Sequence, residues 1–198
     1  MAEASRRSDS SVRRIHTVLL TLPLVLAPAC SQAPGAGEGS GETQRPNTAS
    51  AEIPIDIVDL DGVEAALPGY RGKGMLLNFW AMWCGPCVAE LPELGEVAAE
   101  WRERGGNVVG ISYDLMVPGA DETTIIEETR AFLEKRDLAF PILIFDEIDY
   151  NAINQRFGIG AAIPVTLAIN SEGRIVDRQE GRADKARFEE MMALALGL

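Results

Sequence analysis

Histidine is almost absent from this chain. Its single imidazole, His16, lies in the N-terminal segment, so residues 30–198 contain no histidine. Without it, that part of the chain cannot form a Ser-His or Cys-His nucleophile pair, a His-ligated zinc or copper site, or a haem with a His axial ligand. Its chemistry must therefore rely on thiols, carboxylates or backbone groups.

Positive charge is also scarce. The chain has 18 Lys and Arg residues against 30 Asp and Glu residues, a formal net charge of −12. Residues 30–198 alone carry 14 positive and 28 negative side chains, a formal charge of −14. Because such a surface repels phosphate backbones, we expect no nucleic-acid partner. We interpret the excess of carboxylates as a solvated surface that keeps the protein soluble.

The N-terminal segment has no apolar run long enough to span a bilayer as a helix. Residues 18–26 form a short apolar run behind Arg13 and Arg14, and small residues precede Cys30. This order predicts an export signal. The stretch "APAC", residues 27–30, resembles a bacterial lipoprotein signal, which implies removal of residues 1–29 and a lipid anchor on Cys30. An ordinary cleaved secretory signal is the alternative interpretation.

Large apolar residues are nearly missing from residues 31–50, which are mostly Gly, Ser, Ala, Pro and Thr. This composition predicts a flexible tether over residues 30–50 that starts at the lipidated Cys30. If Cys30 carries lipid, the remaining thiols, Cys84 and Cys87, can pair only with each other. We therefore expect a lipid-anchored protein of the bacterial cell envelope, with a domain at residues 51–198 that faces the periplasm or another extracytoplasmic space.

From residue 51 on, strand-like and helix-like segments alternate. We expect strands within residues 53–60, 75–81, 104–114, 140–146, 164–170 and 174–180. We expect helices after residue 84 and over residues 121–136, 150–158 and 184–198, because their apolar residues recur at helical spacing. Residues 61–74, rich in Gly and with one Pro, are expected to be a turn-rich connection. The alternation predicts an α/β fold whose sheet contains parallel strands and is covered on both faces.

The two cysteines of "WCGPC", Cys84 and Cys87, admit three interpretations. Zinc requires four ligands, and the chain offers neither a second cysteine pair nor histidines. A structural cross-link over so small a loop would stabilise the fold only weakly. Dithiol–disulfide exchange fits best, because the pair follows a buried strand at the first turn of a helix, where free N–H groups and the helix dipole stabilise a thiolate. Pro86 suits this first turn, where its missing N–H has no cost.

The segment "LLNFWAMWCGPCVAELPEL", residues 76–94, resembles the active-site segment of the thioredoxin superfamily, and in particular of its membrane-anchored TlpA/ResA-type branch. The resemblance extends over residues 53–198. It implies a thioredoxin fold, with a central mixed β-sheet flanked by helices on both faces. Residues 114–141 correspond to the insertion of this branch, and "AAIPVTLAINSEGRIV", residues 161–176, corresponds to the strand that follows the family's cis-proline.

The resemblance also assigns roles to the residues of the motif. It implies that Cys84 is the exposed nucleophile, that Cys87 is the buried resolving thiol and that Trp83 packs beside the pair and shields it. Gly85 and Pro86 form a dipeptide like that of thioredoxin, whose potential is about −270 mV, against about −120 mV for strongly oxidising relatives.

Further residues are assigned in the same way. Pro92 matches the kink of the active-site helix, and Glu90 matches an acidic residue held beneath the cysteines. A solvated helix glutamate is the alternative for Glu90. Ile163 and Pro164 match the cis-proline site, whose backbone would pair with a substrate strand.

The chain departs from the family pattern at two positions. Asn78 stands where cytosolic thioredoxin carries a buried aspartate that helps to move the proton of the resolving thiol. Glu90 or a water molecule would have to replace it. Val88 stands where many relatives have Lys or Arg, so we expect less electrostatic support for the Cys84 thiolate than in those relatives.

The resemblance implies an extracytoplasmic thiol–disulfide oxidoreductase that needs no cofactor and no metal. We expect it to reduce protein disulfides, to be recharged by a membrane electron donor of the CcdA or DsbD type, and to serve clients such as apocytochrome c. Two other functions stay open. One is a thiol peroxidase, although Met82 and its neighbours provide no Thr of a Thr-x-x-Cys site. The other is a non-catalytic binding module with this fold.

Overall fold

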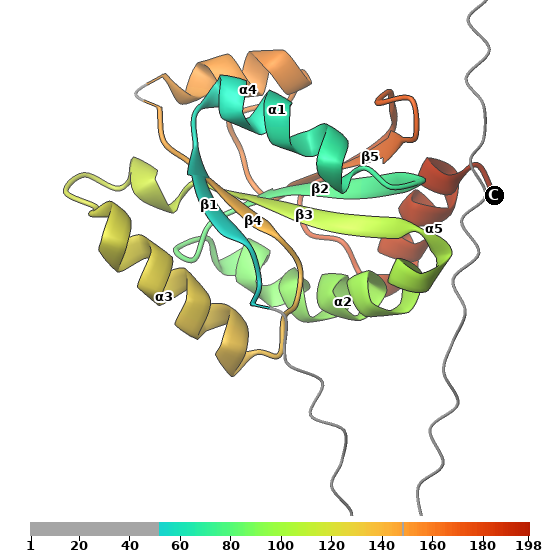
Figure 1. The fold of residues 1–198 in the computed structure, drawn as a ribbon, viewed down its shortest axis with the longest axis horizontal. Helices are drawn as coiled ribbons and strands as arrows, with labels where there is room; N and C mark the ends of the chain where they lie inside the picture. The colour runs from blue at the N-terminus through green and yellow to red at the C-terminus, as the bar shows by residue number, and fades with distance from the viewer. Residues whose placement is uncertain (1–51, 148) are drawn as a thin grey trace, which may run out of the picture. The chain divides into compact units, whose positions relative to one another are not determined.

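The computed structural model describes residues 52–147 and 149–198. The signal and tether expected at residues 1–29 and 30–50 lie outside the described residues. The described part of the chain forms one six-stranded mixed sheet with helices on both faces (Figure 1). The α/β architecture expected from the sequence is confirmed.

The sheet has the order β1-β4-β3-β2-β5-β6. The first four strands in this order are mutually parallel, whereas β5 is antiparallel to β2 and β6 is antiparallel to β5. The strands are β1 (Ile55–Val58), β2 (Gly74–Trp80), β3 (Gly106–Ser112), β4 (Ile142–Phe145), β5 (Val165–Asn170) and β6 (Ile175–Glu180).

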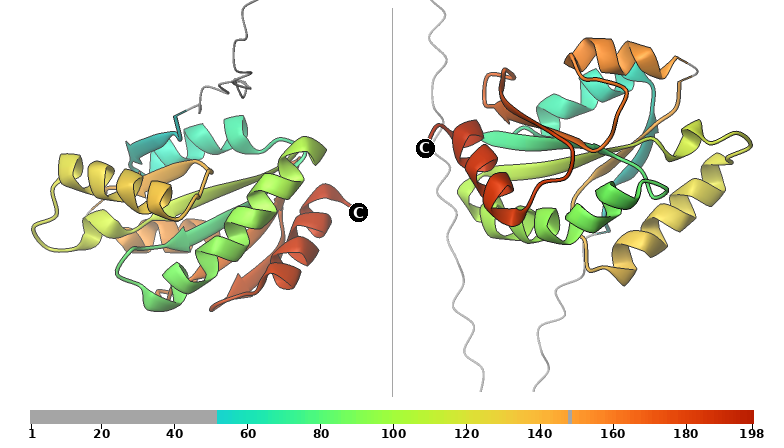
Figure 2. Two further views of the ribbon diagram at one scale, coloured as in Figure 1. Left: turned by 90° about the horizontal axis from the view of Figure 1, so that it is seen from below. Right: turned by 180° about the vertical axis from the view of Figure 1, so that it is seen from behind.

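Helices cover both faces of this sheet. Two of them, α1 and α4, lie on one face, and α2, α3 and α5 lie on the other, as the views from below and behind also show (Figure 2). The stretch expected as the TlpA-type insertion, residues 114–141, contains a short 3₁₀ helix and α3. None of the helices in the described part of the chain has the length and apolar character needed to cross a membrane. The helices are α1 (Leu60–Tyr70), α2 (Gly85–Trp101), α3 (Glu122–Lys135), α4 (Tyr150–Phe157) and α5 (Lys185–Leu196), with 3₁₀ turns at Arg102–Arg104 and Asp114–Met116.

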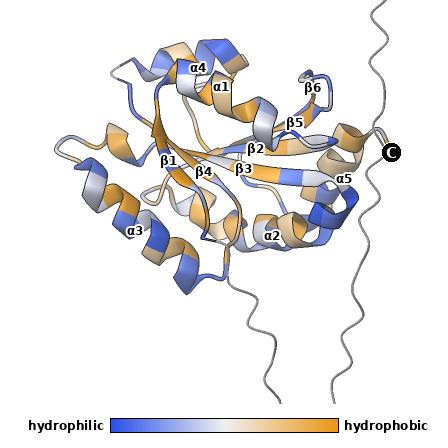
Figure 3. Cartoon of the chain, in the orientation of Figure 1, coloured by the Kyte–Doolittle hydropathy of each residue, from blue (hydrophilic) through white to orange (hydrophobic). Residues whose placement is uncertain are grey.

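The central strand β2 is buried along its whole length. Its apolar residues, like those of β3 and β4, form the band that crosses the middle of the molecule in Figure 3, while polar residues lie on the outer faces of the helices. Close packing of α5 on this strand depends on Gly74, because a Cβ there would lie 2.5 Å from the carbonyl oxygen of Ala195. Helix and strand therefore meet at backbone distance just before the chain runs toward the cysteines.

The expected turn-rich connection at residues 61–74 is wrong, because most of it is helix α1. The side chain of Asp59 accepts a hydrogen bond from the Gly62 N–H at 2.8 Å and so starts the helix at the end of β1. Val63 and Leu67, one turn apart, are buried against the sheet. The Pro that suggested a break, Pro68, lies within three residues of the end of the helix.

Candidate active site

Cys84 and Cys87 lie where β2 ends and α2 begins, and they are joined by a disulfide. Cys84 is the N-cap of α2: its Sγ accepts a hydrogen bond from the N–H of Cys87 at 3.3 Å, and its carbonyl accepts one from the N–H of Val88 at 3.0 Å. The Cys84 sulfur therefore sits at the positive end of a 17-residue helix. This arrangement stabilises a thiolate once the disulfide is reduced.

The two sulfurs differ in access. Cys84 is 7% exposed, whereas Cys87 is fully buried. The small exposed fraction of the pair therefore belongs to Cys84, which is the cysteine that a client thiolate or a client disulfide would meet first. Trp83, the preceding residue, is 57% exposed, so much of its surface is open to solvent.

A segment distant in the sequence lies beside the sulfur of Cys84. The Ile163–Pro164 peptide bond is cis, and the Ile163 carbonyl oxygen lies 3.8 Å from the Cys84 Sγ. Pro164 accepts a hydrogen bond from the N–H of Gly181 at 2.9 Å, which ties this turn to the end of β6. The fold thus brings together Cys84 and the two residues that the sequence assigned to substrate binding.

Glu90 lies on α2 and is completely buried. Its two carboxylate oxygens accept hydrogen bonds of 2.9 Å, one from the side-chain amide of Asn78 and one from the N–H of Ala183. Burial raises the pKa of Glu90 to about 7, and the two hydrogen bonds lower it only in part. Because residues three apart on a helix share one side, Glu90 and Cys87 both face the interior.

Comparisons with known proteins agree with this geometry. A model of the AhpC/TSA family matches residues 47–178. Thiol-disulfide oxidoreductase ResA of Halalkalibacterium halodurans is 32% identical over 138 residues, which cover 70% of this chain and 71% of the relative. Thioredoxin-like protein YneN of Bacillus subtilis is 32% identical over 140 residues, or 71% and 75% of the two chains.

The fold has solved counterparts as well. The structure of a thiol:disulfide interchange protein from Chlorobium tepidum is similar, with a TM-score of 0.54 and 26% identity over 68% of this chain and 85% of that one. The chain belongs to the AhpC/TSA family. Within the thioredoxin superfamily it is of the TlpA/ResA type, and it is a thiol–disulfide oxidoreductase.

Two other residues predicted for the site, Gly85 and Pro92, affect only the backbone of α2. Gly85 is exposed, and a Cβ added there would meet no atom within 4 Å, so no steric contact requires glycine. Pro92 lies inside α2 and provides no N–H for the helix, which leaves one backbone hydrogen bond of the helix unmade.

One buried carboxylate of the site, Asp114, is not among the residues predicted from the sequence. Asp114 follows β3, accepts a hydrogen bond from the N–H of Met82 at 2.9 Å and another from the hydroxyl of Ser112 at 2.6 Å. Burial raises the pKa of Asp114. This residue thereby holds the loop that leads into Cys84. Because β2 and β3 are parallel neighbours, their carboxyl ends meet at one edge of the sheet, which brings Asp114 to Met82.

Proposed function

We propose that this protein reduces protein disulfides outside the cytoplasm, anchored to a bacterial membrane through a lipid on Cys30. The observation that carries the proposal is the pair of unequal cysteines at the start of α2: Cys84 keeps 7% of its surface exposed, whereas Cys87 is fully buried. An accessible sulfur can form an intermolecular bond, and a buried neighbour can break it.

The reaction proceeds in two exchanges. The Cys84 thiolate attacks one sulfur of a client disulfide, which forms a mixed disulfide and releases the other client sulfur as a thiolate that takes up a proton. Cys87 then loses its proton and attacks the Cys84 sulfur. The client leaves with both of its cysteines reduced, and the Cys84–Cys87 disulfide holds the oxidising equivalent.

Glu90 is the group we propose to accept the Cys87 proton. Its pKa of about 7 allows it to exist in both protonation states near neutral pH. The buried amide at Asn78 cannot do this work, but it donates a hydrogen bond to Glu90 and another, of 2.9 Å, to the hydroxyl of Thr166. Asn78 is then a positioning residue for the carboxyl group.

The client is proposed to dock on the cis-proline turn. Because the Ile163 carbonyl lies beside Cys84, an extended client strand that pairs with the backbone of Ile163 and Pro164 would place its own disulfide at the Cys84 sulfur. Disulfide-bearing exported proteins, including apocytochrome c, are the proposed clients.

The proposed direction is reduction. The Gly-Pro dipeptide resembles that of thioredoxin, at about −270 mV, rather than that of relatives near about −120 mV. Each turnover leaves the protein oxidised, so a membrane electron donor of the CcdA or DsbD type is proposed to recharge it. A measured potential close to that of the strong oxidants would reverse the direction.

The function is tested by the reduction of insulin with dithiothreitol as the electron source. Wild-type protein should accelerate the precipitation of insulin chains, and Cys84→Ser should not. Cys30→Ser is the matched control, because it makes the same substitution at a cysteine outside the active-site pair. Cys87→Ser should accumulate mixed disulfides with clients, visible on non-reducing gels. Activity that persists in Cys84→Ser would contradict the proposal.

A thiol peroxidase is the second candidate, favoured by the AhpC/TSA family match. The residues that precede Cys84 include no Thr that could help to bind peroxide. We therefore expect the purified, reduced protein to consume hydrogen peroxide no faster than a free thiol of similar pKa. Rapid peroxide consumption that requires Cys84 would favour the peroxidase.

A further inference from the structure

A hollow of about 390 Å³ adjoins the loop that leads into Cys84. One wall is formed by Met82 and Trp83 of this loop, and the other by the segment that follows β3 and by the first half of α3. Two of its lining residues, Met82 and Trp83, directly precede Cys84 in the sequence, and the others belong to the expected insertion. The proposed reaction does not yet use it.

The walls of the hollow are largely apolar and open to solvent. Trp83 is 57% exposed and Val117 is 44% exposed, and both line the hollow. Large apolar side chains at this exposure beside a reaction centre are typical of surfaces that contact a partner. A flat aromatic face of this kind also attracts a cation that lies over it.

The charges at the hollow are all negative. Asp114, Asp121 and Glu128 line it, and no Lys or Arg does. Asp114 is engaged with the N–H of Met82, and Asp121 caps α3 through the N–H of Thr124 at 3.0 Å. Among the described residues, none of the ion pairs includes Asp121 or Glu128.

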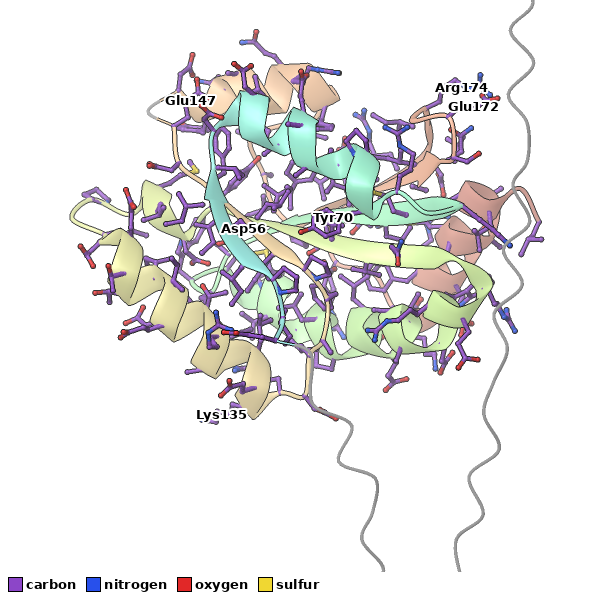
Figure 4. The ribbon with its side chains drawn as sticks, in the orientation of Figure 1. Asp56, Tyr70, Lys135, Glu147, Glu172 and Arg174 are labelled. Atoms are coloured by element: carbon purple, nitrogen blue, oxygen red, sulfur yellow. A yellow bond between two sulfur atoms is a disulfide. The ribbon has the colours of Figure 1, made fainter. Side chains whose placement is uncertain are left out.

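The nearest basic residues of α3 do not neutralise these carboxylates. Arg130 pairs with Glu52 at 3.0 Å. Lys135 is at the far end of the helix from the hollow (Figure 4). The hollow thus combines an aromatic wall with carboxylates that no Lys or Arg side chain lines or pairs with among the described residues.

Building on the proposed function, we infer that this hollow binds the side chain of a Lys or Arg that lies close to the client cysteine. The aliphatic stem of such a residue would pack on Trp83 and Val117, and its charged end would reach Asp121 and Glu128. The client backbone is held at the Ile163–Pro164 turn. The hollow then binds the side chain of a client residue close to the cysteine that Cys84 attacks. The site selects clients whose cysteines have a basic neighbour.

The test uses three synthetic peptides with one internal disulfide that differ only in the residue next to a cysteine, which is Lys, Leu or Glu. The full-length, reduced protein is mixed with each peptide, and the second-order rate constant of peptide reduction is measured. This constant is divided by the one measured for the same peptide with dithiothreitol, which removes intrinsic differences between the disulfides. The Lys peptide should react about fivefold faster than the Leu peptide at low ionic strength. The Glu peptide should be slower than both, and the differences should shrink as salt is added.

Two variants locate the effect. In Asp121→Asn/Glu128→Gln the advantage of the Lys peptide should fall to about one, and asparagine still caps the helix. The control Glu127→Gln/Glu134→Gln removes two exposed carboxylates of α3 that do not line the hollow, and it should keep the advantage. Equal rates for the three peptides with wild type, or an equal loss in both variants, would overturn the inference. Failure to reduce any of the peptides would instead contradict the proposed function.

Discussion

Glu90 is a buried residue of α2, the helix that begins at the reactive pair. Its two carboxylate oxygens accept hydrogen bonds from Asn78 and Ala183. Those donors favour the charged carboxylate, while the apolar surroundings favour the neutral acid, and burial is the larger effect. The result is a pKa of about 7, which lies between the values of an ordinary glutamate and an ordinary thiol. A group so placed can take a proton from Cys87 without holding it at higher pH.

We predict that Glu90→Gln slows the second exchange, in which Cys87 resolves the mixed disulfide. In the wild type, resolution should accelerate as the pH rises through about 7, because Glu90 becomes a carboxylate that can accept the proton. The variant should lose this inflection and be slower by about 10²-fold, the usual contribution of a positioned base. Stopped-flow measurement of resolution between pH 5 and 9 checks the prediction.

The control for this experiment is Glu96→Gln, an exposed glutamate of the same helix. It should leave both the rate and its pH dependence unchanged. An inflection near pH 7 that survives in Glu90→Gln would assign the proton transfer to another group.

The same pKa predicts how stability changes with pH. The folded state binds a proton on Glu90 up to about pH 7, whereas the unfolded chain releases it near 4.5. Between these values the native state holds more protons, so the free energy of unfolding falls as the pH rises. The loss from this one group is on the order of 3 kcal/mol between pH 4.5 and 7. Urea unfolding of the oxidised protein at several pH values should show this slope in the wild type and a much smaller one in Glu90→Gln.

At the scale of elements, helix α1 shows how one side chain decides where a helix starts. The chain leaves β1 at Val58, and Asp59 at once accepts a hydrogen bond from the N–H of Gly62. A Cβ on Gly62 would lie 3.0 Å from the Cβ of Val58, so glycine lets the helix turn back tightly on the strand. The cap and the tight turn together place Val63 and Leu67 on the sheet.

We predict that Asp59→Ala destabilises the protein by about 1 kcal/mol, the usual cost of a lost N-cap. Asp59→Asn should restore most of this stability, because asparagine caps nearly as well. Because α1 lies on the face of the sheet opposite α2, insulin reduction should not change. Denaturant midpoints and the insulin assay measure both effects, and a large loss of activity in Asp59→Ala would contradict this separation of roles.

Features that depend on residues close together in the sequence could be predicted from it. The cysteines, Pro86 and the start of α2 fall within a few consecutive residues, so their arrangement was expected. The Gly and Pro content of residues 61–74 predicts turns rather than helix α1, although Gly62 allows a close turn and Pro68 lies near the helix end.

Contacts between distant segments could not be derived from sequence patterns alone. Asp114 reaches the N–H of Met82 across 32 positions, and Glu90 accepts from the N–H of Ala183 across 93. The carbonyl of Ile163 comes to Cys84 across 79 positions, and only the family resemblance pointed to it. Such pairs depend on strand order, which the alternation of elements does not fix.

At the scale of the whole molecule, the place of the domain in the cell decides which clients and which electron donor it can meet. A dithiol that reduces clients outside the cytoplasm must meet both its clients and its electron donor, and a donor in a membrane is reached most easily by a protein held at that membrane. We propose that a lipid on Cys30, joined to the described domain through residues 31–50, provides this. A single acyl chain binds a membrane only weakly and reversibly. A cysteine that carries two acyl chains would hold the protein there stably.

We predict that Cys30→Ser moves the protein from the membrane fraction to the soluble fraction of a bacterial host. The purified variant should reduce insulin as fast as the wild type, because Cys84, Cys87 and the described domain are unchanged. In cells, however, its active-site pair should be more oxidised, since the variant meets the membrane donor less often. Fractionation with immunoblotting measures the first effect, and alkylation of free thiols after acid quenching measures the second. If Cys30→Ser stays with the membrane, or if wild-type protein is soluble after export, the N-terminal segment is an ordinary secretory signal and the recharging step must work without an anchor.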